Sequence, residues 1–90
     1  EEDKTMAKFT YVITDEVGLH ARPAGLLVKK AKELGAKITL ACNGKTADAT
    51  KIMAIMAMGV MKDMEVEVTV EGDNADAAAT ELEAFFKENL

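Results

Sequence analysis

The chain contains one histidine, one arginine and one proline, and all three lie within four positions, at His20, Arg22 and Pro23. An imidazole is a nucleophile near neutral pH, and the planar guanidinium group matches the oxygens of a phosphate. A proline suits the first turn of a helix, where it stiffens the junction with the preceding loop. The cluster therefore predicts either an imidazole beside a bound anion or an imidazole that itself carries the anionic group.

The position of His20, just before a predicted helix, favours both versions of this site. The first N–H groups of a helix have no partner within the helix and form the positive end of its dipole, so they hold an anion without special side chains. The same positive end favours the neutral, nucleophilic imidazole. We therefore expect Ala21, Pro23 and Ala24 to form the helix end that holds the anionic group. The alternative is an exposed histidine that caps the helix, next to an arginine without a role.

The apolar residues repeat with two periods along the chain. Alternation at every second residue predicts a strand, and spacing of three and four residues predicts a one-sided helix. Strands are expected at residues 8–14, 37–42, 45–49 and 64–71, and helices at about 21–34, 51–58 and 75–88. The pair Asn43–Gly44 predicts a tight hairpin, because both central residues of a type I′ turn have positive φ. Thr50 is expected to cap the second helix, and Gly35 and Gly59 to end the first and second helices.

The element order β-α-β-β-α-β-α predicts an α/β (α+β) fold, an open-faced β-sandwich. The hairpin favours a four-stranded, mostly antiparallel sheet, and the three helices are expected on one face because each has an apolar side to cover. No linker or repeat interrupts residues 7–90, which are expected to form a single domain. Residues 1–6 are expected to be a flexible N-terminal extension.

The basic residues are concentrated in one part of the chain. Positions 20–62 hold eight Lys and Arg residues against two acids, although the whole chain has a net charge of −5. This asymmetry predicts a basic face that meets an anionic ligand or an acidic protein, the alternative being charges that only solvate the surface. Nucleic acid is not expected as a partner, because the chain has no basic run with interleaved aromatic residues.

The single cysteine, Cys42, excludes a disulfide within the chain and favours a reducing, cytoplasmic setting. Cys42 lies in an apolar run and is expected to be a buried core side chain. No signal peptide is recognised, and no apolar run approaches the roughly 20 residues that cross a bilayer. We therefore expect a cytoplasmic protein without membrane insertion.

Residues 52–59 read IMAIMAMG and are apolar on every side of the predicted helix. A short helix on an open sandwich buries only one side, so some of Met53, Met56 and Met58 are expected to be exposed. Exposed methionines suit partners of differing shape, because the side chain is flexible and polarisable. The alternative is that all three fill gaps in the core.

Two motifs in register, GLHARPAG at 18–25 and NGKTADATKIMAIMAMGV at 43–60, resemble the histidine-containing phosphocarrier (HPr) family of the bacterial sugar phosphotransferase system. The resemblance covers residues 7–88 and has the same element order. It implies that His20 is phosphorylated on Nδ1 by enzyme I, which takes the group from phosphoenolpyruvate, and passes the group to enzyme IIA domains of sugar permeases. It also implies a monomeric carrier, not a turnover enzyme, with no metal or cofactor of its own.

The resemblance assigns roles to further residues. Arg22 would steady the phosphoryl group and contact partners, and Pro23 would shape the helix start. The implied partner surface consists of Gly25, Val28, Lys29, Lys32, Lys51, Ile52, Met53 and Met56. Lys51 stands where some members carry a serine that an ATP-dependent kinase phosphorylates, so that regulation is not expected here. Thr50 is left open as a substitute acceptor.

Two other functions remain open on the sequence alone. A regulatory relative would use the same surface to bind a protein in nitrogen or transcriptional control. A module that binds a small molecule is disfavoured, because the chain has no Gly-rich phosphate loop.

Overall fold

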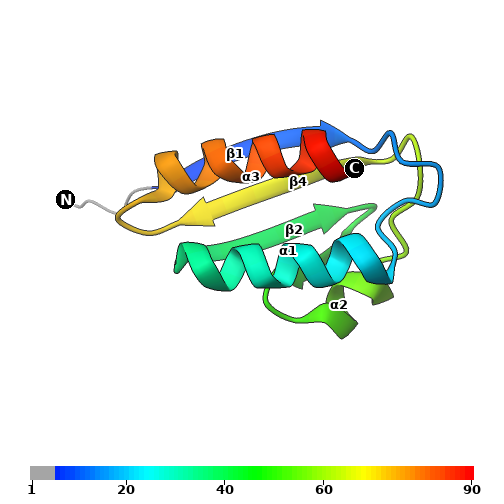
Figure 1. Cartoon of the computed structure of the whole chain (residues 1–90), viewed down its shortest axis with the longest axis horizontal. Coiled ribbons are helices and arrows are strands. Elements are labelled where there is room, and N and C mark those ends of the chain that lie inside the picture. Colours follow the sequence, from blue (N-terminus) through cyan, green and yellow to red (C-terminus); the bar gives the residue numbers. More distant parts are fainter. Residues whose placement is uncertain (1–5) are drawn as a thin grey trace.

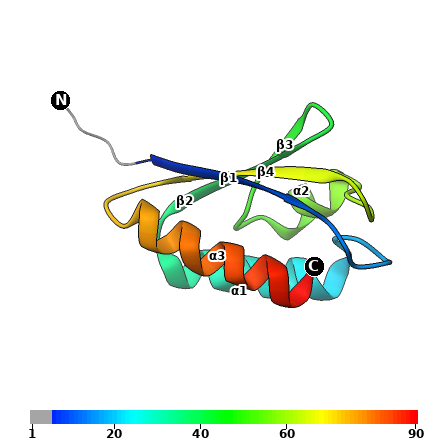
Figure 2. The ribbon, with the colours of Figure 1, turned by 90° about the horizontal axis from the view of Figure 1, so that it is seen from above.

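A four-stranded sheet forms one layer of the protein and three helices form the other (Figures 1 and 2). The structure is a computed structural model and describes residues 6–90. The elements are β1 (Met6–Val12), α1 (Ala21–Leu34), β2 (Lys37–Cys42), β3 (Lys45–Asp48), α2 (Ile52–Ala57), β4 (Glu65–Glu71) and α3 (Ala75–Asn89). The predicted fold class and element order are confirmed. Residues 1–5 of the predicted extension lie outside the described residues, and Met6 already belongs to β1.

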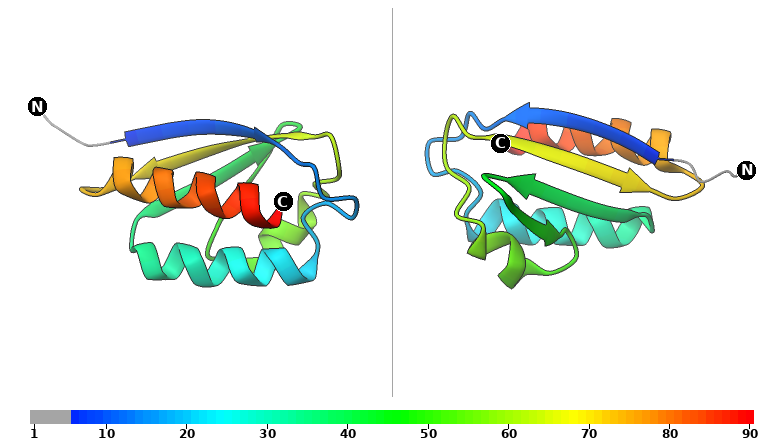
Figure 3. Two further views of the ribbon diagram at one scale, coloured as in Figure 1. Left: turned by 45° about the horizontal axis from the view of Figure 1, so that its top comes forward. Right: turned by 180° about the vertical axis from the view of Figure 1, so that it is seen from behind.

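The sheet has the strand order β1-β4-β2-β3, and every neighbouring pair is antiparallel. The central strand β4 pairs with β1 on one side and β2 on the other, so Val68 lies between Phe9 and Leu40. Alternate residues of β4 point to opposite faces, as period-two patterning requires. The helices cover the inward face, and none of the elements in residues 6–90 covers the outward face (Figure 3).

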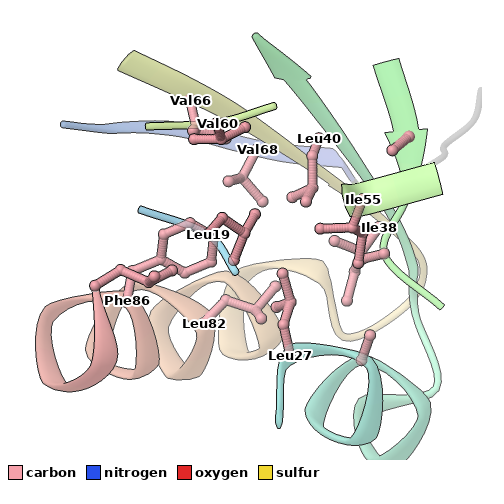
Figure 4. Close-up of a cluster of buried hydrophobic side chains, with 14 of the residues drawn as sticks. Leu19, Leu27, Ile38, Leu40, Ile55, Val60, Val66, Val68, Leu82 and Phe86 are labelled. Carbon is pink, nitrogen blue, oxygen red and sulfur yellow. The ribbon is translucent and has the colours of Figure 1, made fainter. Parts of the chain in front are cut away.

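The core fills the space between the sheet and the helices (Figure 4). Leu27 from α1 and Leu82 and Phe86 from α3 point toward Leu40 and Val68 of the sheet. The ring of Phe86 also makes edge-to-face contacts with the rings of Phe9, Tyr11 and Phe85, a favoured arrangement of aromatic pairs. Burial of these side chains is the main favourable contribution to the stability of such a domain.

Several local predictions are confirmed. Asn43 and Gly44 have φ values of 52° and 77°, as the type I′ turn requires. Gly35 follows α1 in the left-handed conformation, with φ of 69°. Cys42 is buried, and this burial raises the pKa of its thiol.

Some predicted element bounds are corrected. β1 lies two residues earlier than expected, because it pairs along its whole length with β4, from Met6 opposite Glu71 to Val12 opposite Glu65. β3 ends at Asp48, β4 begins at Glu65, and α3 extends to Asn89, each one residue from the predicted bound. Asn74 occupies the N-cap position of α3, but its side-chain amide donates to the carbonyl of Leu34, 3.1 Å away.

The prediction that Thr50 caps the second helix is wrong. α2 begins at Ile52 with Lys51 at the N-cap position. The Thr50 hydroxyl and backbone N–H both donate to Oδ1 of Asp48, at 2.6 Å and 2.8 Å. A hydroxyl this close to a carboxylate forms a charge-assisted hydrogen bond, which outcompetes the neutral cap. Asp48 therefore shapes the turn that leads from β3 into α2.

Replacing Asp48 with alanine is expected to lower the free energy of unfolding at pH 7 by about 0.5–1 kcal/mol, because hydrogen bonds to an exposed carboxylate are lost. The bonds from the side chain and then the backbone of Thr50 hold the pKa of Asp48 below its usual value. These hydrogen bonds therefore contribute fully to the free energy of unfolding above the ordinary carboxyl pKa. Their contribution is lost as the pH falls through the lower pKa of Asp48 in the folded state.

Chemical unfolding of Asp48→Ala and the wild type between pH 7 and pH 2 measures this effect. The difference in the free energy of unfolding between Asp48→Ala and the wild type is expected to become smaller as the pH approaches 2. Asp73→Ala, which removes another exposed carboxylate from a turn, is the control. A difference between Asp48→Ala and the wild type that stays constant with pH would contradict this account of the turn.

Candidate functional site

His20 occupies the N-cap position of α1 in extended backbone conformation, with φ of −94° and ψ of −171°. Its carbonyl accepts the hydrogen bond of the Ala24 N–H at 2.9 Å, which starts the helix. Its imidazole makes no capping hydrogen bond within residues 6–90. The histidine thus begins the helix through its backbone, and its half-buried side chain is left available for chemistry.

The first turn of α1 offers backbone donors beside this imidazole. The N–H groups of Ala21 and Arg22 have no carbonyl partner within the helix, and Pro23 has no N–H. The Ala24 N–H is already bonded to His20, so Ala24 contributes to the helix end as a buried scaffold residue and not as a donor. Arg22 is exposed and adds a permanent positive charge at the same helix end.

A surface hollow of about 260 Å³ opens beside the imidazole. It lies between the start of α1 and the end of α3, and its lining residues are Asp15, His20, Arg22, Pro23, Leu26, Glu88 and Asn89. The end of α3 is held there by Leu90, whose backbone oxygen accepts from the N–H groups of Thr14 and Asp15 and from the Thr14 hydroxyl. Figures 1 and 2 both show the C-terminal end of α3 beside the start of α1.

Asp15, Glu88 and Asn89 were not predicted from the sequence as neighbours of His20. The carboxylate of Asp15 is the notable one, because its Oδ2 lies 3.7 Å from the imidazole Nε2. Position 15 is five residues before the histidine, outside the GLHARPAG motif, and α3 is far away in sequence. The position of Asp15 in the predicted loop just before the histidine is the only sequence signal that pointed to it.

The loop that leads to His20 packs directly on the loop after α2. The Leu19 N–H donates to the Val60 carbonyl at 3.0 Å, and the Leu19 side chain is buried in the core. Gly18 has φ of +81°, and a Cβ placed there would lie 2.4 Å from the Val60 oxygen and 2.7 Å from Cα of Met61. This close approach ties the start of α1 to the end of α2.

The exposed side of α2 carries an apolar patch formed by Ile52, Met53 and Met56. Met53 is 77% exposed and Met56 is 43% exposed, whereas Met58 is 5% exposed and belongs to the core. The prediction that only some of the methionines are exposed is thus confirmed. Gly25 of α1 faces this patch, since a Cβ placed on it would lie 3.9 Å from Cδ1 of Ile52.

Lysines flank the apolar patch. Lys29 and Lys32 are exposed on α1, and Lys51 is exposed at the start of α2, while Val28 of α1 is half-buried. Lys30 differs, because its Nζ donates to Oε1 of Glu81 on α3 at 2.9 Å. This hydrogen bond holds the pKa of Lys30 above its usual value and places Lys30 in the contact between the two helices.

The structure therefore arranges the predicted site residues in two neighbouring groups. One group surrounds His20 at the start of α1, and the other consists of the patch on α2 and the lysines of α1 and α2. Among residues 6–90, no three His, Cys, Asp or Glu side chains lie close enough together to hold a metal ion. None of the helices in that same part of the chain has the length and apolar character needed to cross a membrane.

Comparison with known proteins identifies the family. A family model described as the PTS HPr component phosphorylation site matches residues 7–88, which include both groups of site residues. The chain belongs to the HPr family. The phosphocarrier protein HPr of Mycoplasma capricolum subsp. capricolum is 44% identical over 73 residues, which cover 81% of this chain and 82% of the relative.

Solved structures of HPr proteins have the same fold. The structure of the histidine-containing phosphocarrier protein of Mycoplasma has a TM-score of 0.84 and 39% identity, covering 88% of this chain and 90% of that one. HPr from Bacillus anthracis has a TM-score of 0.83 and 33% identity, covering 90% of this chain and 96% of that one. This chain is therefore a phosphocarrier-type component of the phosphotransferase system.

Proposed function

We propose that this HPr-family protein accepts a phosphoryl group on His20 from phospho-enzyme I and passes it to enzyme IIA domains of sugar permeases. The observation that carries the proposal is an imidazole with no capping role in residues 6–90, located at the start of α1 beside free backbone donors and Arg22. The protein would be consumed and regenerated with each transfer, so it acts as a carrier and not as a turnover enzyme.

The chemistry requires little beyond this arrangement. The lone pair of Nδ1 attacks phosphorus, the new N–P bond forms, and the bond from phosphorus to the donor group of enzyme I breaks with its electron pair going to that donor. The carried group brings about two negative charges at neutral pH. The helix end and the Arg22 guanidinium stabilise these charges without forming a covalent bond. The N–P bond stays labile, so a nucleophile of the enzyme IIA domain attacks phosphorus in turn, and the N–P bond breaks with its electron pair returning to Nδ1.

The experiment is a transfer assay with labelled phosphoenolpyruvate, enzyme I and several enzyme IIA domains. The protein is expected to gain a label that is lost in acid and stable in base, as a phosphoramidate is, and then to lose it to an enzyme IIA domain. An unlabelled protein, or a label that survives acid, would refute the proposal. Labelling without transfer to any sugar-specific enzyme IIA domain would indicate a regulatory relative.

The surface proposed to meet these partners is formed by Gly25, Val28, Lys29, Lys32, Lys51, Ile52, Met53 and Met56. Its support is the combination of exposed lysines with an exposed apolar patch next to the helix that begins at His20. An apolar centre with charges around it is the usual composition of a protein interface. We propose that the protein functions as a monomer and in the cytoplasm.

Reversing the charges of Lys29 and Lys32 to glutamate is expected to slow association with enzyme I roughly tenfold at low salt, because the positive face steers an acidic partner. The difference is expected to shrink as salt rises, since mobile ions screen exposed charges. Stopped-flow association at several salt concentrations measures both effects.

Lys37→Glu is the control for this charge reversal, since Lys37 is exposed at the start of β2, beyond the C-terminal end of α1. It reverses one charge where the tested variant reverses two, so an equal slowing per reversed charge would mean that net charge alone matters. A rate that does not change with salt would leave the apolar patch on α2 as the main contact.

Thr50 is a poor substitute for the regulatory serine of the family. Its hydroxyl already donates to Asp48, and a phosphoryl group there would place about two negative charges against that carboxylate. The neighbouring Lys51 places a positive charge at the start of α2, opposite in sign to a phosphoryl group. We therefore propose that this surface is not regulated by phosphorylation at the start of α2.

A further inference from the structure

We propose that Asp15 is a positioning residue for His20, whose carboxylate keeps the ring proton on Nε2 and so leaves Nδ1 as the nucleophile. The proposal deepens the phosphocarrier function and rests on it. Its basis is the 3.7 Å contact between Asp15 Oδ2 and His20 Nε2, in which the side chains are 36% and 39% exposed. The contact involves the ring nitrogen that is not the proposed phosphoryl acceptor.

The carboxylate of Asp15 is held in place by its own loop. The Val17 N–H donates to the same Oδ2 at 3.3 Å, and the Gly18 N–H donates to the Asp15 carbonyl at 3.0 Å. The Asp15 N–H in turn donates to the backbone oxygen of Leu90 at 2.8 Å. One of these bonds holds the carboxylate and the other two hold the backbone of Asp15, so this short side chain loses less freedom when it engages the imidazole than a long surface side chain would.

The contact selects one form of the imidazole. A neutral imidazole carries a proton on only one nitrogen, and the partner of that N–H decides which one. A carboxylate accepts hydrogen bonds but donates none when ionised, so it favours the proton on Nε2. The lone pair of Nδ1 is then free to attack phosphorus.

The same carboxylate also stabilises the product. When the Nδ1 lone pair forms the N–P bond, the proton on Nε2 stays, no proton leaves the ring, and the ring becomes cationic. Asp15 then faces the positive ring at Nε2, while Arg22 faces the phosphoryl group. The other charged residue that lines the hollow is Glu88. A contact of 3.7 Å is longer than a hydrogen bond, but contacts of this kind shorten and strengthen when a docked partner excludes water.

Measurement of the ring nitrogens by ¹⁵N NMR tests the first half of the proposal without any partner protein. The chain has one histidine, so both ring signals come from His20, and their couplings to the ring C–H protons distinguish Nδ1 from Nε2. In the wild type at alkaline pH the Nε2–H form is expected to dominate. In Asp15→Ser the fraction of the Nδ1–H form is expected to rise about twofold, because serine still accepts from the Val17 N–H but is too short to reach the ring.

Transfer kinetics test the second half. In Asp15→Ser and Asp15→Asn, the rate of phosphorylation at saturating enzyme I is expected to fall about tenfold, with little change in the enzyme I concentration at half-maximal rate. Glu16→Gln is the matched control, because Glu16 is an exposed carboxylate in the same loop and is expected to leave both the tautomers and the rate unchanged. Unfolding midpoints verify that all the variants fold.

Unchanged tautomers in Asp15→Ser, or an equal effect in Glu16→Gln, would overturn the proposal. A lower rate with unchanged tautomers would also overturn it, since that outcome describes a loop residue and not a positioning residue. If the wild type accepts no phosphoryl group at all, the phosphocarrier function fails, and the NMR result still reports separately on the contact.

Discussion

Replacing His20 with alanine is expected to abolish the acid-labile phosphoryl label, a loss of more than about a thousandfold in transfer, because the nucleophile itself is removed. The chain offers no second imidazole, since His20 is its only histidine. Its only cysteine, Cys42, is buried, and burial raises the pKa of the thiol, so the sulfur is not a substitute nucleophile. Label on wild-type protein and no label on His20→Ala, in the same assay with enzyme I, is the expected result.

The loss is expected without unfolding, which is what makes the experiment decisive. The imidazole is half-buried and makes no capping bond within residues 6–90, and the helix starts through the backbone carbonyl of position 20, which alanine keeps. The free energy of unfolding should therefore change by less than about 1 kcal/mol. His20→Gln, which preserves the size and polarity of the side chain, is the second control. An acid-labile label on either variant would show that the phosphoryl group is carried elsewhere.

The part of the site that is contiguous in sequence could be predicted from the sequence. His20, Arg22 and Pro23 lie within one turn of each other, and the rules for a helix start depend only on local geometry. The exposed methionines of α2 were predicted for the same reason, because a short helix that is apolar all round cannot bury every side.

The long-range half of the site could not be predicted in this way. The hollow beside His20 exists because the end of α3 is held by hydrogen bonds between the start of the loop at Thr14 and the oxygen of Leu90. Nothing in the local pattern near either residue specifies that they meet. The contact of Asp15 with the imidazole depends on the same meeting, since the Asp15 N–H shares that oxygen.

The error at Thr50 has a different cause, which is competition between two local rules. Threonine is a good N-cap, but aspartate two residues earlier is a good acceptor for the hydroxyl and N–H of the residue at position i+2. The charged acceptor wins, as the 2.6 Å hydrogen bond shows. Local rules therefore predict that a turn is present here, but choosing between the two hydrogen-bond patterns requires the relative strengths of the acceptors.

Replacing Gly18 with alanine is expected to destabilise the fold by roughly 3 kcal/mol or more, the magnitude seen when backbone strain and a steric clash combine. The new Cβ would meet backbone atoms of Val60 and Met61 at 2.4 Å and 2.7 Å, and backbone cannot rotate away as a side chain can. The loop would have to separate from the end of α2, which breaks the hydrogen bond from Leu19 to Val60 and displaces His20. Transfer to His20 should fall together with stability.

Gly44→Ala separates the clash from the backbone strain, because Gly44 has nearly the same positive φ, +77°, with no atom within 4 Å of an added Cβ among the described residues. It should cost only about 1 kcal/mol, the penalty for a left-handed alanine. Denaturant unfolding of the two variants, with the transfer assay at a temperature where both are folded, measures the comparison. Equal losses of unfolding free energy in the two variants would mean that the loops before His20 and after α2 are not held together by their close approach. A loss of phosphoryl transfer confined to Gly18→Ala would mean that the phosphoryl site depends on that approach.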